Sequence, residues 1–181
     1  MDDKYYEINV AGCKRKLPIC PVSEKFDIAA FIMFGDIELT ERCAKLLSSK
    51  CDFEYDVLIT AEAKGIPLCY EMAKQSGKKY IVARKGVKVY MSNPIHVEVK
   101  SITTKRLQNL YLSEDEYKFL NGKKVLIVDD VISTGESLKA IEELVSKANG
   151  KVVGKVAVLA EGDAANRKDI VYLETLPLFF K

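Results

Sequence analysis

Two adjacent carboxylates, Asp129 and Asp130, directly follow four apolar residues and precede a turn rich in small and hydroxyl-bearing residues. The apolar run at 125–128 is typical of a strand that is buried on both faces. Ionised carboxylates only accept hydrogen bonds, so the acid pair suits sugar hydroxyls or the water shell of a metal ion. The turn at 133–137 suits a phosphate, because its glycine lets the backbone approach an anion and its hydroxyl groups can donate hydrogen bonds. The stretch therefore predicts a sugar site next to a phosphate site.

A helical pattern starts directly after this turn, and the free N–H groups of a helix start attract phosphate. Its apolar positions fall on one face: Leu138, Ile141, Leu144, Val145 and Ala148. Gly150 stands where a C-terminal cap is expected. The alternative interpretation is an ordinary solvated turn in which Ser133 or Thr134 caps the helix.

Two further segments place charge at the ends of expected strands. The small-residue turn at 61–65 carries one acid and one base and joins a strand at 57–60 to a helix at 66–76. A basic pair at 84–85 follows the next strand, at 80–83. Strands that alternate with helices imply right-handed crossovers and a parallel sheet, whose ligands bind outside the carboxyl ends of the strands. We therefore expect all three charged segments to meet at one sheet edge.

The rest of the chain supports an α/β fold. Further strands are expected at 5–10, 152–160 and 170–173, and further helices at 38–49 and 113–120. The apolar segment 28–36 fits a helix or a strand equally well, and we expect the apolar tail 176–180 to pack down. The segment 87–120 mixes a proline with basic and polar residues and predicts a hairpin-like excursion that can move over the site.

Composition limits the classes of function. The chain has 181 residues, enough for one domain, and its 28 lysines and arginines nearly balance 26 acids, which argues against a nucleic-acid binder. No apolar run reaches membrane-spanning length, and the N-terminus does not resemble a signal peptide. Five cysteines without a Cys-x-x-Cys pair predict reduced thiols in a cytoplasmic protein, with Cys43 and Cys69 in the core. We interpret the one histidine, His96, as a loop or strand residue rather than a metal ligand.

The apolar strand, the acid pair and the following Thr-Gly-x-Ser resemble the ribose-phosphate loop of the type I phosphoribosyltransferases. The turn at 61–65 resembles the pyrophosphate loop of adenine phosphoribosyltransferases, which implies a cis peptide between Glu62 and Ala63. Lys64 stands where that family usually has arginine, so the charge is kept and the bidentate fork is lost. The stretch 84–88 resembles the Arg-Lys-x-x-Lys stretch of the same subfamily, although Val-Tyr replaces the usual Leu-Pro after it.

The resemblance implies a single-domain, Rossmann-like parallel-sheet fold over 1–181, with an N-terminal hood at 1–36 and a flexible excursion at 87–120. It implies catalytic roles for Asp129, Asp130 and a loop acid, for which the candidate is Glu98. The 5′-phosphate would lie on Ser133, Thr134, Gly135, Glu136 and Ser137. The pyrophosphate would contact Glu62, Ala63, Lys64, Gly65, Arg84, Lys85 and Lys88. The base would contact Val131 and Phe26.

The implied reaction is the transfer of ribose 5-phosphate from phosphoribosyl pyrophosphate to a purine in purine salvage, with adenine as the first choice. Mg²⁺ would enter with phosphoribosyl pyrophosphate and reach the acid pair through water. The implied assembly is a homodimer that binds neither nucleic acid nor membrane. Two alternatives stay open: a xanthine or other oxopurine enzyme, and a non-catalytic regulator that senses phosphoribosyl pyrophosphate or a nucleotide. A dinucleotide-binding protein is disfavoured, because the chain has no Gly-x-Gly-x-x-Gly motif.

Overall fold

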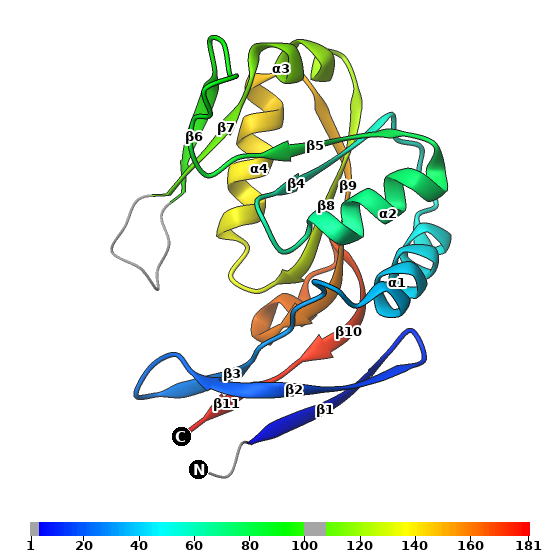
Figure 1. Cartoon of the computed structure of the whole chain (residues 1–181), viewed down its shortest axis with the longest axis vertical. Coiled ribbons are helices and arrows are strands. Elements are labelled where there is room, and N and C mark those ends of the chain that lie inside the picture. Colours follow the sequence, from blue (N-terminus) through cyan, green and yellow to red (C-terminus); the bar gives the residue numbers. More distant parts are fainter. Residues whose placement is uncertain (1–3, 100–107) are drawn as a thin grey trace.

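The computed structural model of the chain describes residues 4–99 and 108–181. Within these residues, five parallel strands form a central sheet in the order β10-β9-β8-β4-β5. The strands are β4 (Val57–Ala61), β5 (Lys79–Ala83), β8 (Lys124–Ile132), β9 (Lys151–Glu161) and β10 (Val171–Leu176). The expected parallel α/β sheet is therefore confirmed, with β8 at its centre (Figure 1).

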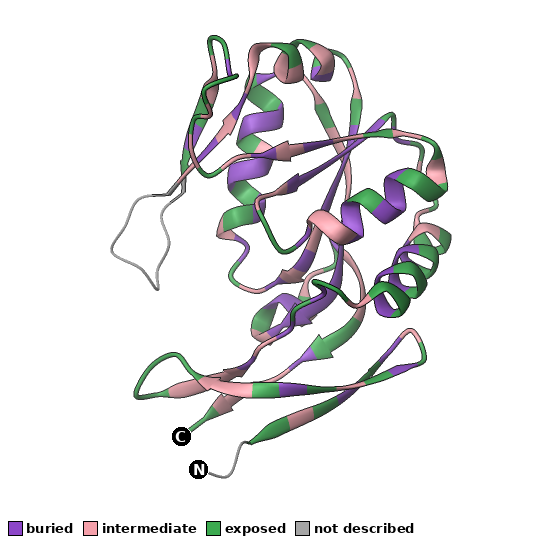
Figure 2. Ribbon diagram, in the orientation of Figure 1, coloured by how far each residue is buried: buried purple, intermediate pink, exposed green. Residues whose placement is uncertain are grey.

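Helices cover both faces of this sheet. The helices α1 (Ile37–Lys50) and α2 (Ile66–Ser76) pack on one face with Leu126 and Val128 of β8. The helix α4 (Glu136–Lys147) packs on the other face with Val125 and Ile127. Because side chains alternate along a strand, these four apolar residues are split between two cores, and all four are fully buried. Figure 2 shows the middle strands of the sheet largely in the colour of buried residues.

A separate antiparallel sheet joins the two ends of the chain. Its order is β1-β2-β3-β11, and its strands are β1 (Tyr5–Val10), β2 (Cys13–Pro21), β3 (Phe26–Ala29) and β11 (Leu178–Phe180). The apolar tail packs down as expected, since it pairs with β3 as an edge strand. In Figure 1 this antiparallel sheet lies beyond β10, at the bottom of the view.

The excursion after β5 contains a hairpin, as expected. Its strands β6 (Ile95–Val99) and β7 (Gln108–Leu112) pair antiparallel and lead into α3 (Glu114–Leu120). At the start of α3, the backbone N–H of Ser113 donates to Oε2 of Glu116 at 2.8 Å, which caps the helix. The connection between the two strands, residues 100–107, lies outside the described residues.

Three details differ from the sequence-based expectations. The strand β8 runs on to Ile132, so the acid pair lies inside the strand rather than after it. The helix α4 ends with Ala148 as its C-cap, and Asn149 rather than Gly150 takes the left-handed conformation. Gly150 meets a different demand, because a Cβ there would lie 3.2 Å from the carbonyl oxygen of Leu120. The ambiguous segment 28–36 is strand only to Ala29, and irregular chain leads from there to α1.

None of the helices in residues 4–99 and 108–181 is both long and apolar enough to span a membrane.

Candidate functional site

The carboxyl ends of β4, β5 and β8 surround a cavity of about 250 Å³. The expected meeting of the charged segments at one sheet edge is confirmed, because residues from all three line this cavity. Its lining consists of Ala61, Glu62, Ala63, Lys64, Lys85, Leu110, Asp129, Asp130, Val131 and Ser137.

The acid pair in the wall of this cavity is asymmetric. Asp130 is nearly fully buried, and Nζ of Lys64 donates to its Oδ2 at 2.8 Å. Asp129 accepts a hydrogen bond from the backbone N–H of Asp130 at 2.9 Å. Burial raises the pKa of Asp129 well above its usual range, and the neighbouring carboxylate of Asp130 raises it further. The second acid is thus held by a cation, whereas the first is disfavoured as an anion until a ligand supplies donors or positive charge.

Gly65 lets the first loop approach the acid pair. A Cβ at this position would lie 2.5 Å from Oγ1 of Thr60 and 3.3 Å from the Cα of Asp129, so any side chain here would force its neighbours to shift. The peptide between Glu62 and Ala63 is cis, as the resemblance implied. The loop at 62–65 is therefore packed directly against β8, and this contact brings Lys64 to Asp130.

Glu62 contacts the basic residues that follow β5. Its Oε2 accepts the backbone N–H of Lys85 at 2.9 Å, and its Oε1 lies 3.7 Å from Nη1 of Arg84 and 3.9 Å from Nζ of Lys88. The hydrogen bond from Lys85, followed by the charges of Lys88 and Arg84, lowers the pKa of Glu62. These basic residues are therefore held near the cavity by one carboxylate.

The turn after β8 forms a second cavity of about 100 Å³ that shares Asp129, Val131 and Ser137 with the first. Its wall includes the backbone of the turn, in which Gly135 has φ +81° and precedes α4. The Oγ1 of Thr134 accepts the backbone N–H of Glu136 at 3.5 Å. A small cavity next to a helix start, with nearby hydroxyl groups, suits a phosphate.

Six of the expected site residues line neither of these cavities: Glu98, Phe26, Arg84, Lys88, Gly65 and Glu136. Glu98 lies exposed on β6, where it pairs in register with Asn109. Phe26 lies on β3 of the antiparallel sheet, with its ring centroid 6.4 Å from that of Phe180. Arg84 and Lys88 reach the site only through Glu62, since neither lines a described cavity.

Two residues near the site were not expected from the sequence. Leu110 of β7 lines the larger cavity, and no sequence pattern marks it. Arg167 follows the 3₁₀ helix η1 (Gly162–Asn166), and its guanidinium packs against Gly135. The rule that ligands bind at carboxyl ends of strands could have drawn attention to Arg167, because its segment follows β9.

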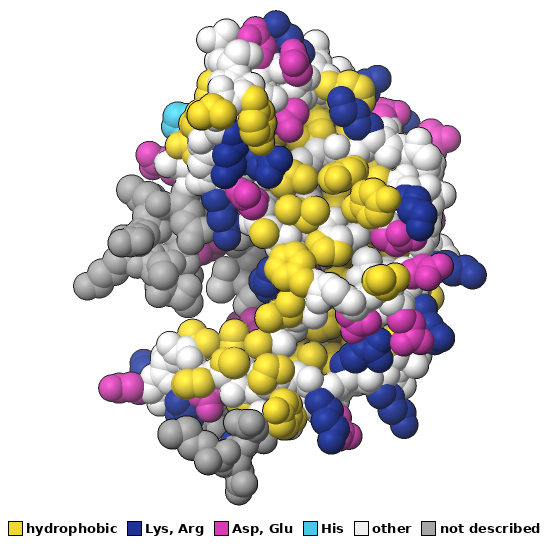
Figure 3. All heavy atoms as spheres, viewed as in Figure 1, with side chains coloured by type: hydrophobic (Ala, Val, Ile, Leu, Met, Phe, Trp, Pro, Cys, Tyr) yellow, Lys and Arg dark blue, Asp and Glu magenta, His cyan; other side chains and the backbone are white. Residues whose placement is uncertain are grey.

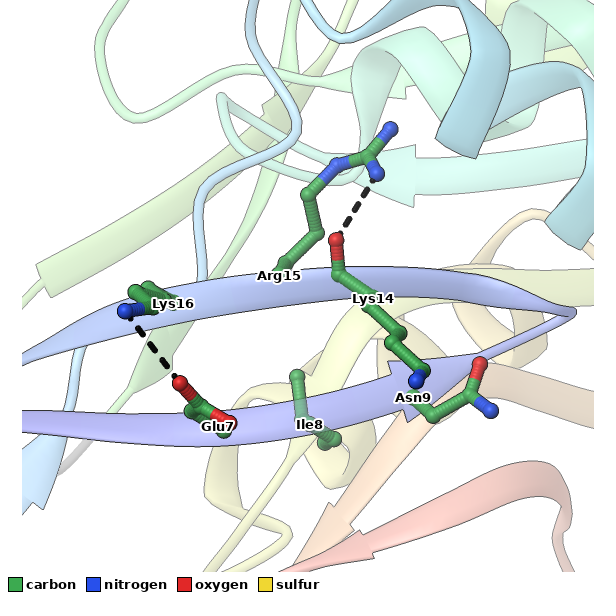
Figure 4. Close-up of a pocket in the computed structure, with 6 residues that line it drawn as sticks. All are labelled: Glu7, Ile8, Asn9, Lys14, Arg15 and Lys16. Carbon is green, nitrogen blue, oxygen red and sulfur yellow. Dashed lines mark hydrogen bonds and ion pairs between the residues drawn. The ribbon is translucent and has the colours of Figure 1, made fainter.

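A larger hollow of about 370 Å³ lies over β1 and β2, away from the acid pair. Figure 4 shows Lys16 beside Glu7, with 3.3 Å between Nζ and Oε1, and Arg15 turned away from them. This hollow is open, and its charged side chains form surface ion pairs or contact the backbone. It is therefore a weaker candidate for a catalytic site than the cavity at the sheet edge.

Comparison with known proteins agrees with this geometry. Residues 36–178 match the family model described as phosphoribosyl transferase domain. An adenine phosphoribosyltransferase structure from Thermoanaerobacter pseudethanolicus superposes with a TM-score of 0.70, covering 94% of this chain and 95% of that chain at 20% identity. The fold is therefore that of the type I phosphoribosyltransferases.

Curated relatives include proteins of three kinds. A hypoxanthine/guanine phosphoribosyltransferase from Methanotorris igneus is 33% identical over 81% of each chain. An adenine phosphoribosyltransferase from Petrotoga mobilis is 34% identical over 67% of this chain and 65% of its own length. The purine biosynthesis transcriptional repressor PurR of Bacillus subtilis is 28% identical over 75% of this chain, which spans only about half of that protein, 47% of its length.

Proposed function

The chain belongs to the phosphoribosyl transferase family, and from this premise we propose that it transfers ribose 5-phosphate from phosphoribosyl pyrophosphate to a purine base. The observation that supports this most directly is the pair of joined cavities around the acid pair, with cations at one end and a helix start at the other. A sugar between two phosphate groups needs this order of chemical groups. In this proposal residues 1–181 act as one domain.

The two ends of the substrate would be bound differently. The 5′-phosphate enters the small cavity at 133–137, and the pyrophosphate enters the large cavity between Lys64 and the cations around Glu62. The acids Asp129 and Asp130 accept hydrogen bonds from the ribose hydroxyls. Occupation of the two cavities fixes the sugar, so that the incoming nitrogen and the departing pyrophosphate lie on opposite sides of C1′.

In the reaction, the bond from C1′ to the pyrophosphate oxygen breaks and the oxygen keeps the electron pair. A ring nitrogen of the purine uses its lone pair to form the new bond to C1′, and the N–H proton of the base leaves to the released pyrophosphate or to water. Lys64 and the basic residues at 84–88 stabilise the negative charge that grows on pyrophosphate. The carboxylates near the sugar stabilise the positive charge that develops on the ribose. Glu98 stays the candidate for the loop acid, and this role requires the β6–β7 hairpin to move.

The donor set fits Mg²⁺ that arrives with the substrate. Two carboxylates in the cavity wall suit the water shell of a hard cation. Asp129 and Asp130 would hold this shell, and the ion would supply charge neutralisation to the pyrophosphate. A cation here would also favour the ionised form of Asp129, whose pKa is raised in the protein alone.

We favour adenine as the base because the loops at 61–65 and 84–88 resemble those of adenine enzymes. The hypoxanthine/guanine relative supports an oxopurine instead. The similarity to PurR supports a second candidate function, a regulator that binds phosphoribosyl pyrophosphate or a nucleotide without catalysis. Lys64 and the cations around Glu62 favour catalysis, because a sensor does not need to stabilise a leaving group.

One assay separates these candidates. The protein is incubated with Mg²⁺ and phosphoribosyl pyrophosphate, and adenine, hypoxanthine, guanine and xanthine are offered separately while nucleotide is measured by chromatography. We expect product with adenine. Product only with an oxopurine would overturn the choice of base. Calorimetric binding of phosphoribosyl pyrophosphate without product from any base would favour the regulator.

The proposal includes a homodimer in the cytoplasm. Ile32, Phe34, Ile37 and Tyr70 are each more than half exposed, and Figure 3 shows hydrophobic side chains gathered over α2 and the segment before α1. Such a patch is typical of a protein interface, and a second copy of the chain is the occupant that the family implies. Ile37→Glu should convert the dimer to a monomer in light scattering.

The free thiols of all five cysteines are consistent with a reducing compartment.

A further inference from the structure

The loop that would hold the 5′-phosphate lacks a cation of its own. Residues 133–137 include two serines, a threonine, a glycine and an acid, but no lysine or arginine. The cations Lys64, Arg84 and Lys88 lie at the opposite end of the site, beside Asp130 and Glu62. A phosphate monoester carries nearly two negative charges at neutral pH. Its loop would therefore depend on uncharged donors, the backbone N–H and hydroxyl groups, unless a cation comes from elsewhere in the fold.

Arg167 is the cation behind this loop. A Cβ on Gly135 would lie 2.6 Å from its Nη1 and 3.8 Å from its Cζ. The guanidinium thus occupies the space beside the Cα of Gly135 that any other residue would need for its side chain. Gly135 also has φ +81°, a conformation that L side chains rarely adopt. A side chain at position 135 would therefore need both a strained backbone and a shift of the guanidinium.

A charge network holds this guanidinium in place. Nε of Arg167 donates to Oδ1 of Asp169 at 2.9 Å, and its Nη2 donates to Oδ2 at 2.7 Å. Asp169 also accepts a hydrogen bond from Lys155 of β9 at 2.8 Å, and Lys155 pairs with Glu142 of α4. The hydrogen bond from Arg167, followed by that from Lys155, holds the pKa of Asp169 far below its usual range. The network ties the arginine to the helix whose first turn would bind the phosphate.

The orientation of the fork leaves one nitrogen for the loop. Asp169 takes Nε and Nη2, and Nη1 is the guanidinium nitrogen nearest to the Cβ position of Gly135. Within the described residues, Arg167 does not line the small cavity, whereas Gly135 does. Arg167 can therefore act on a ligand only indirectly. It supports the backbone of Gly135, and its positive charge lies behind that residue.

We propose that Arg167 is a positioning residue for the ribose-phosphate loop, which holds Gly135 in place and adds the positive charge that residues 133–137 lack. This inference rests on the proposed binding of the 5′-phosphate at this loop. The segment after β9, in which no sequence motif was identified, thereby gains a role in substrate binding.

The test compares two variants with the same change in net charge at neighbouring positions. Arg167→Gln removes the guanidinium, and Lys168→Gln removes an exposed charge next to it. Calorimetry measures the dissociation constants of ribose 5-phosphate and of pyrophosphate at two salt concentrations. We expect Arg167→Gln to weaken ribose 5-phosphate by about tenfold and to reduce the salt dependence of its binding, while pyrophosphate binds as before. Lys168→Gln should change neither ligand by more than about twofold.

A variant that retains charge separates electrostatics from packing. Arg167→Lys keeps the charge but loses the fork to Asp169, and we expect it to recover part of the affinity for ribose 5-phosphate. Equal weakening by Arg167→Lys and Arg167→Gln, with an unchanged salt dependence, would overturn the electrostatic role. Pyrophosphate binding in each variant reports that the site is folded.

The controls also separate this inference from the proposed function. If Arg167→Gln binds ribose 5-phosphate as tightly as the wild-type protein does, the inference is overturned and the proposed function stays intact. Wild-type protein that binds pyrophosphate but no ribose 5-phosphate would overturn the assignment of the loop, and the inference with it.

Discussion

The two ends of the candidate site hold charge in opposite ways. At the end proposed for pyrophosphate, cationic side chains already pair with carboxylates: Lys64 with Asp130, and Arg84 and Lys88 with the single carboxylate of Glu62. At the 5′-phosphate end, the loop at 133–137 offers backbone and hydroxyl groups. A ligand at the first end must therefore replace existing ion pairs, whereas a ligand at the second meets groups that are already oriented. The difference suggests that the first end responds to substrate and the second positions it.

The acid pair joins the two ends, and its substitution should have the largest effect. Asp130→Asn removes the charged partner of Lys64 and the charge that we propose faces the sugar, so we expect turnover to fall about 100-fold or more. Stability should change far less, because asparagine fills the same space and can still accept a hydrogen bond from Lys64. Steady-state kinetics and thermal unfolding measure the two effects. Full activity in both Asp130→Asn and Asp129→Asn would refute the role of the acid pair.

The glycine of the phosphate loop allows a matched comparison. Gly135→Ala forces a side chain into positive φ and into the guanidinium of Arg167, so we expect it to abolish binding of ribose 5-phosphate and to lower stability by about 1–2 kcal/mol. Gly77→Ala has the same backbone penalty, but no heavy atom lies within 4 Å of its added Cβ. It should be destabilised similarly and bind normally. Equal binding by both variants would show that the loop is not preset by Arg167 and Gly135.

The paired cations of the pyrophosphate end lead to the third prediction. Lys64→Met leaves the buried carboxylate of Asp130 without its cation, and we expect a loss of about 1–3 kcal/mol in unfolding free energy and about tenfold weaker pyrophosphate binding. The double variant with Asp130→Asn should regain stability without regaining affinity.

Lys74→Met is the control for this change, because Lys74 pairs at 3.2 Å with the mostly buried Glu71 on α2. It should lose stability without losing pyrophosphate affinity. If the double variant is no more stable than Lys64→Met, the unpaired carboxylate of Asp130 is not the cause of the lost stability.

The smallest expected effect is a pH dependence of stability. The pKa of Asp129 is raised in the folded protein from an ordinary value of 3.8, so the neutral form stabilises the fold below this value. That contribution is lost as the pH rises through the folded pKa. Denaturant unfolding should therefore show wild-type protein losing stability relative to Asp129→Asn as the pH rises above about 4. A constant difference across this range would mean that Asp129 titrates normally.

Short sequence patterns were sufficient for the central sheet. The run 125–128 had to be buried on both faces because it is continuously apolar, and helices 38–49 and 66–76 formed where the apolar period placed them. The segment 28–36 was undecidable because its apolar residues have no period. It became a short strand followed by irregular chain because β2 and β11 offered pairing partners to β3.

The candidate site was predictable to the extent that its residues follow strands of the central sheet. The sequence alone determined the acid pair, the turn at 133–137 and the two charged loops, because strand ends in a parallel sheet converge. Only the tertiary structure decided how their charges are balanced, since the partner of Lys64 lies 66 positions away in the chain. The place of Arg167 behind Gly135 was likewise decided by the packing of β9 and α4 around β8. The spacing of apolar residues is a local property that can be read from the sequence. The pairing of charges that are distant in the chain depends on distances that exist only after folding.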